Sequence, residues 1–292
     1  MSISNIGNTC YLGSALHCIM NTRFFDQYIR TLHLNKSKTN PILFKYSELH
    51  MRVMMGQTQV DPTPFYTLVR QSYPYFNNKE QHDAHEAIQV ILDMLSTNMS
   101  ALAKSTYTHP DNILGCLCWN KHSYNAIDEI FKVQYKTVIK CSHCTYELIK
   151  YQCEYGILTT TLHSLGYIIK LDDYKCDKCG TRDHCTQRTT IYHYPPNLVV
   201  YSDNFLELND SGCLKPPGYS KWYKLYATCN HSTSKVLRTS GHYTAFVKNY
   251  RTNQWHYKND DLSCLLVKGF SNNRARILDG AVVFMLERID VN

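Results

Sequence analysis

Cys10 is the residue of this chain whose surroundings most directly suggest reactive chemistry. It lies in NIGNTCYLGSALHC, residues 5–18, between turn-forming residues and a segment, YLGSALHCIM, that can form a helix with Asn8 or Thr9 as its cap. The partial positive charge at a helix N-terminus lowers the pKa of a cysteine, and a thiolate attacks carbonyl carbon far better than a thiol does. Cys10 is therefore a candidate nucleophile. The alternative is a small cysteine that fills a gap in the core.

A cysteine nucleophile needs a base, and one histidine stands in a suitable position. His242 lies at the start of a predicted strand, SGHYTAFVKN, directly after Gly241, and glycine there allows another backbone or a substrate to approach closely. The segment WHYKNDD follows and supplies Asn259, Asp260 and Asp261. A hairpin of the two strands would place an orienting side chain beside the imidazole. The residues alone leave a structural histidine as the alternative.

Two CxxC pairs about thirty residues apart have the spacing of a zinc site. Two thiolates in a short turn can hold one side of a metal ion, and two such turns complete a tetrahedral site. The predicted ligands are Cys141, Cys144, Cys176 and Cys179. Possible substitutes nearby are His143, Cys153, His184 and Cys185. Coincidence in a cysteine-rich chain and a redox role are the alternatives, and neither pair follows the βαβ pattern of a redox motif.

The remaining pattern indicates helices first and strands later. Residues 81–95, QHDAHEAIQVILDML, place alanine, isoleucine and leucine on one face of a helix. After about residue 128, segments such as EIFKVQYKTVIK, TTIYHYPPNLVVYS, HYTAFVKN and GAVVFMLERI are short and rich in β-branched and aromatic residues. This order predicts an α+β fold. Because no clear linker is present, we expect a single domain over residues 1–292.

Composition limits the classes of function. The chain has 292 residues, 43 % of them hydrophobic, which suits a globular protein with a sizeable core. It contains no long apolar run and no signal-peptide pattern, so we expect no membrane partner and a place inside the cell, in the cytoplasm or nucleus. The 13 cysteines should then be mostly reduced. The net charge is +7, but the basic residues are scattered, so we expect no nucleic-acid partner.

Several segments, taken together, resemble the motifs of ubiquitin-specific proteases. NIGNTCY resembles their cysteine box, and SGHYTAFVKN with WHYKNDD resembles their histidine box. QHDAHEAIQVILDML resembles their QQDAHEF-type helix, the two CxxC pairs lie where the family has zinc-bearing fingers, and YPPNLVVYSDNF resembles the strand that follows. The resemblance implies a papain-like fold of thumb, palm and fingers. The thumb would span about residues 1–115 and the fingers about 141–190, with the palm formed by the remainder.

The resemblance also implies roles for individual residues. Cys10 would be the nucleophile and His242 the base, and Asn259 occupies the usual third position after the tryptophan of that box. Asp260 matches an acidic neighbour that contributes in some members, and Asn5 falls at the position whose amide stabilises the oxyanion. These five residues are the predicted catalytic set.

The implied activity is a deubiquitinating thiol protease that cleaves after the C-terminal glycine of ubiquitin, acting as a monomer with one structural zinc ion. Asp83 and Glu86 are the predicted substrate-binding acids, because the tail of ubiquitin carries arginine. Asp83 could instead simply cap a helix. Alternatives to this activity are a protease of a ubiquitin-like modifier, a catalytically weak ubiquitin-binding scaffold and a zinc-knuckle nucleic-acid module. The chain departs from the family pattern at Gly13 and His17, where asparagine and glutamine are usual, which leaves the catalytic groups in place.

Overall fold

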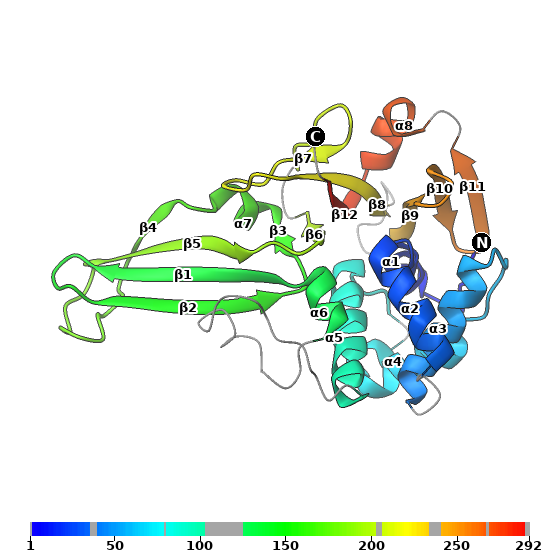
Figure 1. The fold of residues 1–292 in the computed structure, drawn as a ribbon, viewed down its shortest axis with the longest axis horizontal. Coiled ribbons are helices and arrows are strands. Elements are labelled where there is room, and N and C mark those ends of the chain that lie inside the picture. The colour runs from blue at the N-terminus through cyan, green and yellow to red at the C-terminus, as the bar shows by residue number, and fades with distance from the viewer. Residues whose placement is uncertain are drawn as a thin grey trace.

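The computed structural model describes residues 2–35, 40–78, 80–102, 125–202, 206–233, 241–266 and 269–289. In these residues a group of helices packs against one large sheet, and a second, narrow sheet extends away from both (Figure 1). Within the described residues, each helix is too short or too polar to span a bilayer.

Helices form the first part of the chain, as the sequence predicts. They are α1 Cys10–Met20, α2 Arg23–Asn35, α3 Pro41–Met54, α4 Thr63–Ser72, the 3₁₀ turn η2 Pro74–Asn77 and α5 Ala84–Leu102. All residues of α1 except Gly13 are buried, and α1 packs between α5 and strand β9 (Gly241–Asn249). A helix that is covered on every side lies inside the protein. The N-terminus of α1, where Cys10 lies, is therefore fixed by its neighbours.

The large sheet carries the other half of the candidate site. Its strands are β3 Ile157–Leu158, β6 Asn197–Tyr201, β7 Cys213–Leu214, β8 Trp222–Thr233, β9, β10 Gln254–Asn259, β11 Leu262–Leu266 and β12 Ala281–Ile289. The order is β11-β10-β9-β8-β12-β6-β3, with β7 paired to β8. In β12, Val283 and Met285 join the core beneath the helices, whereas Phe284 and Leu286 join a second core with α8 (Gly269–Leu278). Successive side chains of β12 point to opposite faces of the sheet, so both faces are covered by a core.

The narrow sheet projects to the left in Figure 1. It consists of β1 Val133–Cys141, β2 Glu147–Glu154, β4 Ile168–Leu171 and β5 Cys185–His193, in the antiparallel order β2-β1-β5-β4. The short helix α6 Ala126–Phe131 comes directly before β1 in the chain, and the short helix α7 Thr159–Ser164 lies between β3 and β4. A small cluster of cysteines lies at the end of β1 and the start of β5, away from the helices. We call this sheet the fingers sheet.

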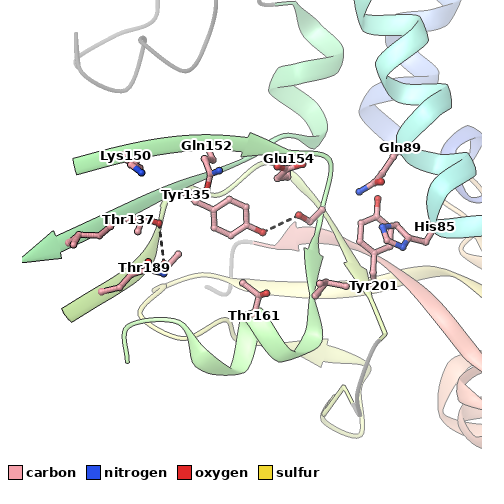
Figure 2. Close-up of a pocket in the computed structure, with 14 residues that line it drawn as sticks. His85, Gln89, Tyr135, Thr137, Lys150, Gln152, Glu154, Thr161, Thr189 and Tyr201 are labelled. Carbon is pink, nitrogen blue, oxygen red and sulfur yellow. Dashed lines mark hydrogen bonds between the residues drawn. The ribbon is translucent and has the colours of Figure 1, made fainter. Parts of the chain in front are cut away.

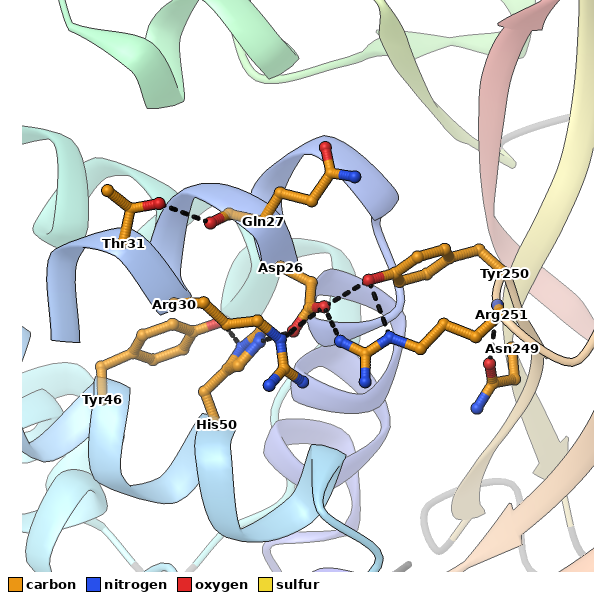
Figure 3. A network of polar contacts seen from close by, with 9 residues as sticks. All are labelled: Asp26, Gln27, Arg30, Thr31, Tyr46, His50, Asn249, Tyr250 and Arg251. Atoms are coloured by element: carbon orange, nitrogen blue, oxygen red, sulfur yellow. Dashed lines mark hydrogen bonds and ion pairs between the residues drawn. The ribbon is translucent and has the colours of Figure 1, made fainter. Parts of the chain in front are cut away.

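A buried carboxylate ties the helices to the turn between β9 and β10 (Figure 3). Asp26 of α2 is fully buried and accepts hydrogen bonds from Arg30, from His50 of α3 at 2.7 Å, and from Tyr250 and Arg251 of that turn. Burial opposes ionisation, but the hydrogen bonds from His50, Arg30 and Tyr250 outweigh it and hold the pKa of Asp26 well below its ordinary value. The network fixes the β9–β10 hairpin against α2 and α3.

Three element predictions need correction. The segment EIFKVQYKTVIK does not begin as a strand, because its first three residues end α6, whose cap is the Asn125 side chain. The helix predicted for residues 81–95 begins at Ala84, because the carboxylate of Asp83 accepts a hydrogen bond from the backbone of its first turn. It continues to Leu102. The segment TTIYHYPPNLVVYS divides at Pro195 and Pro196 into β5 and β6, which belong to different sheets.

Candidate active site

The loop before α1 is built around the side chain of Asn5. Its Oδ1 accepts hydrogen bonds from the backbone N–H of Gly7 at 3.1 Å and of Thr9 at 3.2 Å, and from the Thr9 hydroxyl at 2.9 Å. Gly7 and Asn8 have φ values of 102° and 47°, which glycine and asparagine tolerate best. This explains the Gly-Asn pair in the sequence. The turn places Thr9 at the N-cap, so Cys10 is the first residue of α1.

The thiol of Cys10 lies against the start of β9. Cys10 is 3 % exposed, and its Sγ accepts a hydrogen bond from the backbone N–H of Tyr243 at 3.5 Å. We expected the helix N-terminus to lower the pKa of this thiol. Burial instead raises the pKa of Cys10, despite the hydrogen bond from Tyr243, and the carboxylate of Asp260 adds to the increase. In this state the thiol is protonated at neutral pH, and it needs a base to become a nucleophile.

His242 is adjacent to Tyr243 and is held by the side chain of Asn259. Its Nε2 lies 2.6 Å from Asn259 Oδ1, across the β9–β10 pair, and 3.8 Å from Asp260 Oδ2. An amide oxygen can only accept, so Nε2 carries the proton and Nδ1 is the basic nitrogen. Among the described residues no hydrogen bond joins this ring to the Cys10 thiol. Catalytic hydrogen bonds often tighten only when substrate binds, and His242 is the candidate base.

Gly241, the residue before His242, lies against a side chain that the sequence does not reveal. A Cβ at this position would lie 1.9 Å from Nε2 of His231, which belongs to the neighbouring strand β8. The backbone N–H of Gly241 donates to Gln81 Oε1 at 3.2 Å, which links β9 to the segment before α5. The close approach expected at this glycine is therefore made by a side chain of β8.

The two predicted substrate-binding acids have different positions. Asp83 caps α5, because its Oδ1 accepts from the backbone N–H of His85 at 2.9 Å, yet it stays exposed. Its charge lies close enough to Tyr243 to contribute to the raised pKa of that phenol, for which burial is the first cause. Asp83 therefore lies beside the strand of His242. Glu86 is exposed in the first turn of α5.

The two departures from the family pattern share a small cavity with Cys10. Gly13 and His17 line a small cavity with Asn5, Cys10 and Asp260. His17 is 4 % exposed, and neither ring nitrogen has a hydrogen-bond partner among the described residues. Burial lowers the pKa of His17, so its ring is neutral.

The four predicted metal ligands come together at the tip of the fingers sheet. Sγ atoms of all four lie within 4.8 Å of one another, and the distances Cys141–Cys179 and Cys144–Cys176 are both 3.8 Å. A tetrahedral zinc site with Zn–S bonds of about 2.3 Å requires S–S separations of about 3.8 Å. The arrangement therefore fits one zinc ion. Cys185 packs beside this cluster, but it is not one of the four.

A groove of about 570 Å³ opens between the base of the fingers sheet, α5 and α7 (Figure 2). Figure 2 shows His85 and Gln89 reaching toward it from α5, opposite Tyr135 of β1. The ring of His85 packs on Tyr201, with centroids 3.7 Å apart, and the Tyr135 hydroxyl donates to the Gly156 carbonyl at 3.1 Å. The lining of the groove mixes polar and aromatic groups. Sequence reasoning did not identify this groove, although the i, i+4 spacing of His85 and Gln89 places both on one face of α5.

Cys10, His242 and Asn259 lie on α1, β9 and β10, and only the folded chain brings them together. The Cys10 thiol is hydrogen-bonded to the backbone of Tyr243, the residue after His242, and an amide holds the His242 ring.

Comparison with known proteins identifies the family. The model of the ubiquitin carboxyl-terminal hydrolase family matches residues 1–278, and the chain belongs to this family. Ubiquitin carboxyl-terminal hydrolase 2 of Homo sapiens is 24 % identical over 334 residues, covering 97 % of this chain and 54 % of that protein. Usp2 of Drosophila melanogaster is 25 % identical over 305 residues, covering 89 % of this chain and 32 % of that protein. The chain thus spans about half or less of the length of these relatives.

Solved structures confirm the predicted fold class. The SAGA DUB module of Ubp8, Sgf11, Sus1 and Sgf73 bound to monoubiquitin contains a chain that matches all of this one with a TM-score of 0.74. The match covers 69 % of that chain at 17 % identity. The same kind of module bound to ubiquitin aldehyde matches with a TM-score of 0.71, at 17 % identity and with 70 % of that chain covered. The α+β arrangement is therefore that of these catalytic domains. The residue boundaries of thumb, palm and fingers stay a prediction.

Proposed function

We propose that this chain is a deubiquitinating thiol protease that hydrolyses the isopeptide or peptide bond after the C-terminal glycine of ubiquitin. The observation that carries the proposal is the contact between His242 Nε2 and Asn259 Oδ1. His242 is followed in the chain by Tyr243, whose backbone N–H is hydrogen-bonded to Cys10 Sγ. Family membership supports ubiquitin as the modifier.

The chemistry begins with proton transfer from Cys10 to Nδ1 of His242. The thiolate then attacks the carbonyl carbon of the terminal glycine, and the resulting tetrahedral intermediate collapses to a thioester as the amine leaves with the proton from the imidazolium. Water, deprotonated by His242, attacks the thioester and regenerates the thiol. Because burial raises the pKa of Cys10, transfer to His242 is a required part of this step.

Asn5 and the helix N-terminus supply the oxyanion site. The Oδ1 of Asn5 is occupied by the donors of Gly7 and Thr9, which fixes the amide and leaves its NH₂ group as the donor. Together with the backbone N–H of Cys10, it would stabilise the negative oxygen of the intermediate. Loss of one such donor typically reduces the rate by about a hundred- to a thousand-fold.

Substrate would bind on the side of the molecule where α5 begins. The exposed Asp83 lies near the start of β9 and would bind the arginine-bearing tail of ubiquitin, with Glu86 as the second acid. The groove between α5 and the fingers sheet would hold part of the body of ubiquitin. Charge reversal of Asp83 and of Glu86, followed by measurement of ubiquitin affinity, tests this assignment. Unchanged affinity in both variants contradicts it.

One zinc ion would be held by the cysteine cluster at the fingers tip, where it adds folding energy and takes no part in the reaction. We further propose that the chain acts as a monomer inside the cell, where most of its 13 cysteines remain reduced.

Hydrolysis of a fluorogenic ubiquitin C-terminal amide tests the proposal directly. We expect turnover by the wild-type chain, loss of turnover in Cys10→Ala, and retention in Cys213→Ala, which changes a cysteine of β7 away from the site. Parallel substrates made from ubiquitin-like modifiers distinguish the second candidate activity. Cleavage of those substrates alone, or ubiquitin binding without hydrolysis, contradicts the proposed function.

A further inference from the structure

The fingers sheet is a single layer, and its strand register sorts its side chains onto two faces. One face lines the groove, and we call it the groove face. It carries Tyr135, Thr137, Ile139, Lys150, Gln152, Glu154, Gln187 and Thr189. Because successive side chains of a strand point to opposite faces, the residues between these form a second surface, which we call the outer face. It carries Lys136, Val138, Lys140, Glu147, Ile149, Tyr151, Thr186, Arg188, Thr190, Ile168 and Lys170.

A row of three aliphatic residues and one arginine crosses the outer face. Ile149 of β2 pairs with Val138 of β1, Val138 pairs with Arg188 of β5, and Arg188 pairs with Ile168 of β4. These four residues therefore stand side by side across the whole sheet. Ile149 is 42 % exposed and Ile168 is 70 % exposed. Ile149 and Val138 are neighbours, and the guanidinium-bearing Arg188 lies between them and Ile168, so the row offers apolar and cationic groups side by side.

Positive charge lies in this row and beside it. The outer face carries four basic side chains, Lys136, Lys140, Lys170 and Arg188, and one acidic side chain, Glu147. Glu147 is paired with Lys140 at 2.8 Å. The excess of positive charge is thus set by the remaining three basic residues, and it favours an acidic partner.

We propose that the outer face of the fingers sheet is a docking surface for an acidic amphipathic segment of a partner protein. The apolar side of such a segment would lie along the row of Ile149, Val138 and Ile168, and its carboxylates would reach Arg188 and the lysines beside the row. This surface lies on the side of the sheet opposite the groove, so a partner bound there leaves the groove free for substrate. The proposal does not depend on the catalytic assignment.

The chemistry of the row favours a protein over a nucleic acid. Aliphatic side chains offer no flat surface on which bases can stack. The aromatic pair nearby, Tyr151 and Tyr192, makes an edge-to-face contact with ring centroids 5.2 Å apart, so the two rings are engaged with each other. Four strands about 4.8 Å apart give a row about 14 Å long. This matches about ten residues of helix, which are about 15 Å long.

A labelled synthetic peptide tests the surface. The probe is an amphipathic helix of about 14 residues with leucine on one face and glutamate elsewhere, and its partner probe has lysine in place of glutamate. Fluorescence anisotropy measures binding to the full chain. We expect the double variant Lys170→Glu, Arg188→Glu to bind the acidic peptide roughly tenfold or more weakly than wild type, with a loss that shrinks at high salt. Ile168→Ser should weaken binding at every salt concentration.

Lys150→Glu is the matched control, because Lys150 follows Ile149 in β2 but lines the groove. It should leave affinity for the acidic peptide unchanged. The double variant should melt at the wild-type temperature and hydrolyse the ubiquitin amide at the wild-type rate. The proposal is overturned if wild type does not bind the acidic peptide, if the double variant binds it equally well, or if the lysine peptide binds as tightly. Preference for a single-stranded oligonucleotide, lost in the same variant, would identify a nucleic-acid surface and also overturn it.

Discussion

Replacing Asn259 by alanine removes the hydrogen bond that orients the candidate base. The bond joins His242 Nε2 to Asn259 Oδ1 at 2.6 Å, and during the reaction the ring becomes positively charged. A hydrogen bond to a charged group contributes about 1.5–3 kcal/mol, which corresponds to a rate reduction of about 10- to 150-fold. Because Asn259 contacts the base, we expect kcat to fall with little change in KM. Asn259→Asp keeps an acceptor and should recover most of the rate.

The neighbouring acid provides the comparison. Asp260 Oδ2 is 3.8 Å from the ring, beyond hydrogen-bond distance, and both side chains are partly exposed. An ion pair of this kind contributes about 0.2–1 kcal/mol, so Asp260→Ala should reduce the rate about fivefold or less. Steady-state kinetics on a ubiquitin amide measure both variants and the double variant. Full activity in Asn259→Ala together with an inactive Asp260→Ala would refute the reasoning and assign the orienting role to the acid.

Three further predictions follow from contacts elsewhere. Metal analysis of protein purified without added zinc should give about one zinc ion per chain, and Cys144→Ser should lower both this value and the melting temperature. Gly241→Ala should destabilise the fold by about 1–3 kcal/mol, because its Cβ would lie 1.9 Å from the ring of His231, and adding His231→Ala should restore part of the loss. If the double variant melts no higher than the single one, this contact is not the cause. Asp26→Asn should cost about 1.5–3 kcal/mol at neutral pH, since it removes the buried carboxylate that accepts charged hydrogen bonds from Arg30 and Arg251. The folded-state pKa of Asp26 is depressed, so its contribution is present above the unfolded value of about 4 and is lost as pH falls. Urea unfolding at pH 7 and at about pH 3 should show a smaller difference between Asp26→Asn and wild type at the lower pH.

Local sequence was sufficient to predict that His242 meets Asn259. The short link between β9 and β10 is a local feature, and it brings His242 beside Asn259 as expected. The Gly-Asn turn before Cys10 is also local, and it places Cys10 at the start of α1. The two CxxC turns likewise act locally, and strands β1 and β5 then bring them together.

Properties that depend on packing were not predictable. The raised pKa of Cys10 comes from burial by elements distant in sequence, and this outweighs the helix end that the sequence shows. The ring of His231 explains Gly241 only once β8 and β9 are paired. The partners of Asp26 come from α2, α3 and a turn more than two hundred residues away. The outer face of the fingers sheet became visible only from the register of four strands.

The most direct test of the central claim is the reaction of this chain with ubiquitin that carries an electrophile in place of its C-terminal glycine. Mass spectrometry of the intact protein and of its peptides would give the number of adducts and their position. We predict one adduct per chain, located at Cys10, and none in Cys10→Ala, while Cys213→Ala reacts as wild type does. Folded protein that forms no adduct, or an adduct at another cysteine, would contradict the assignment of Cys10 as the nucleophile of a ubiquitin-directed protease.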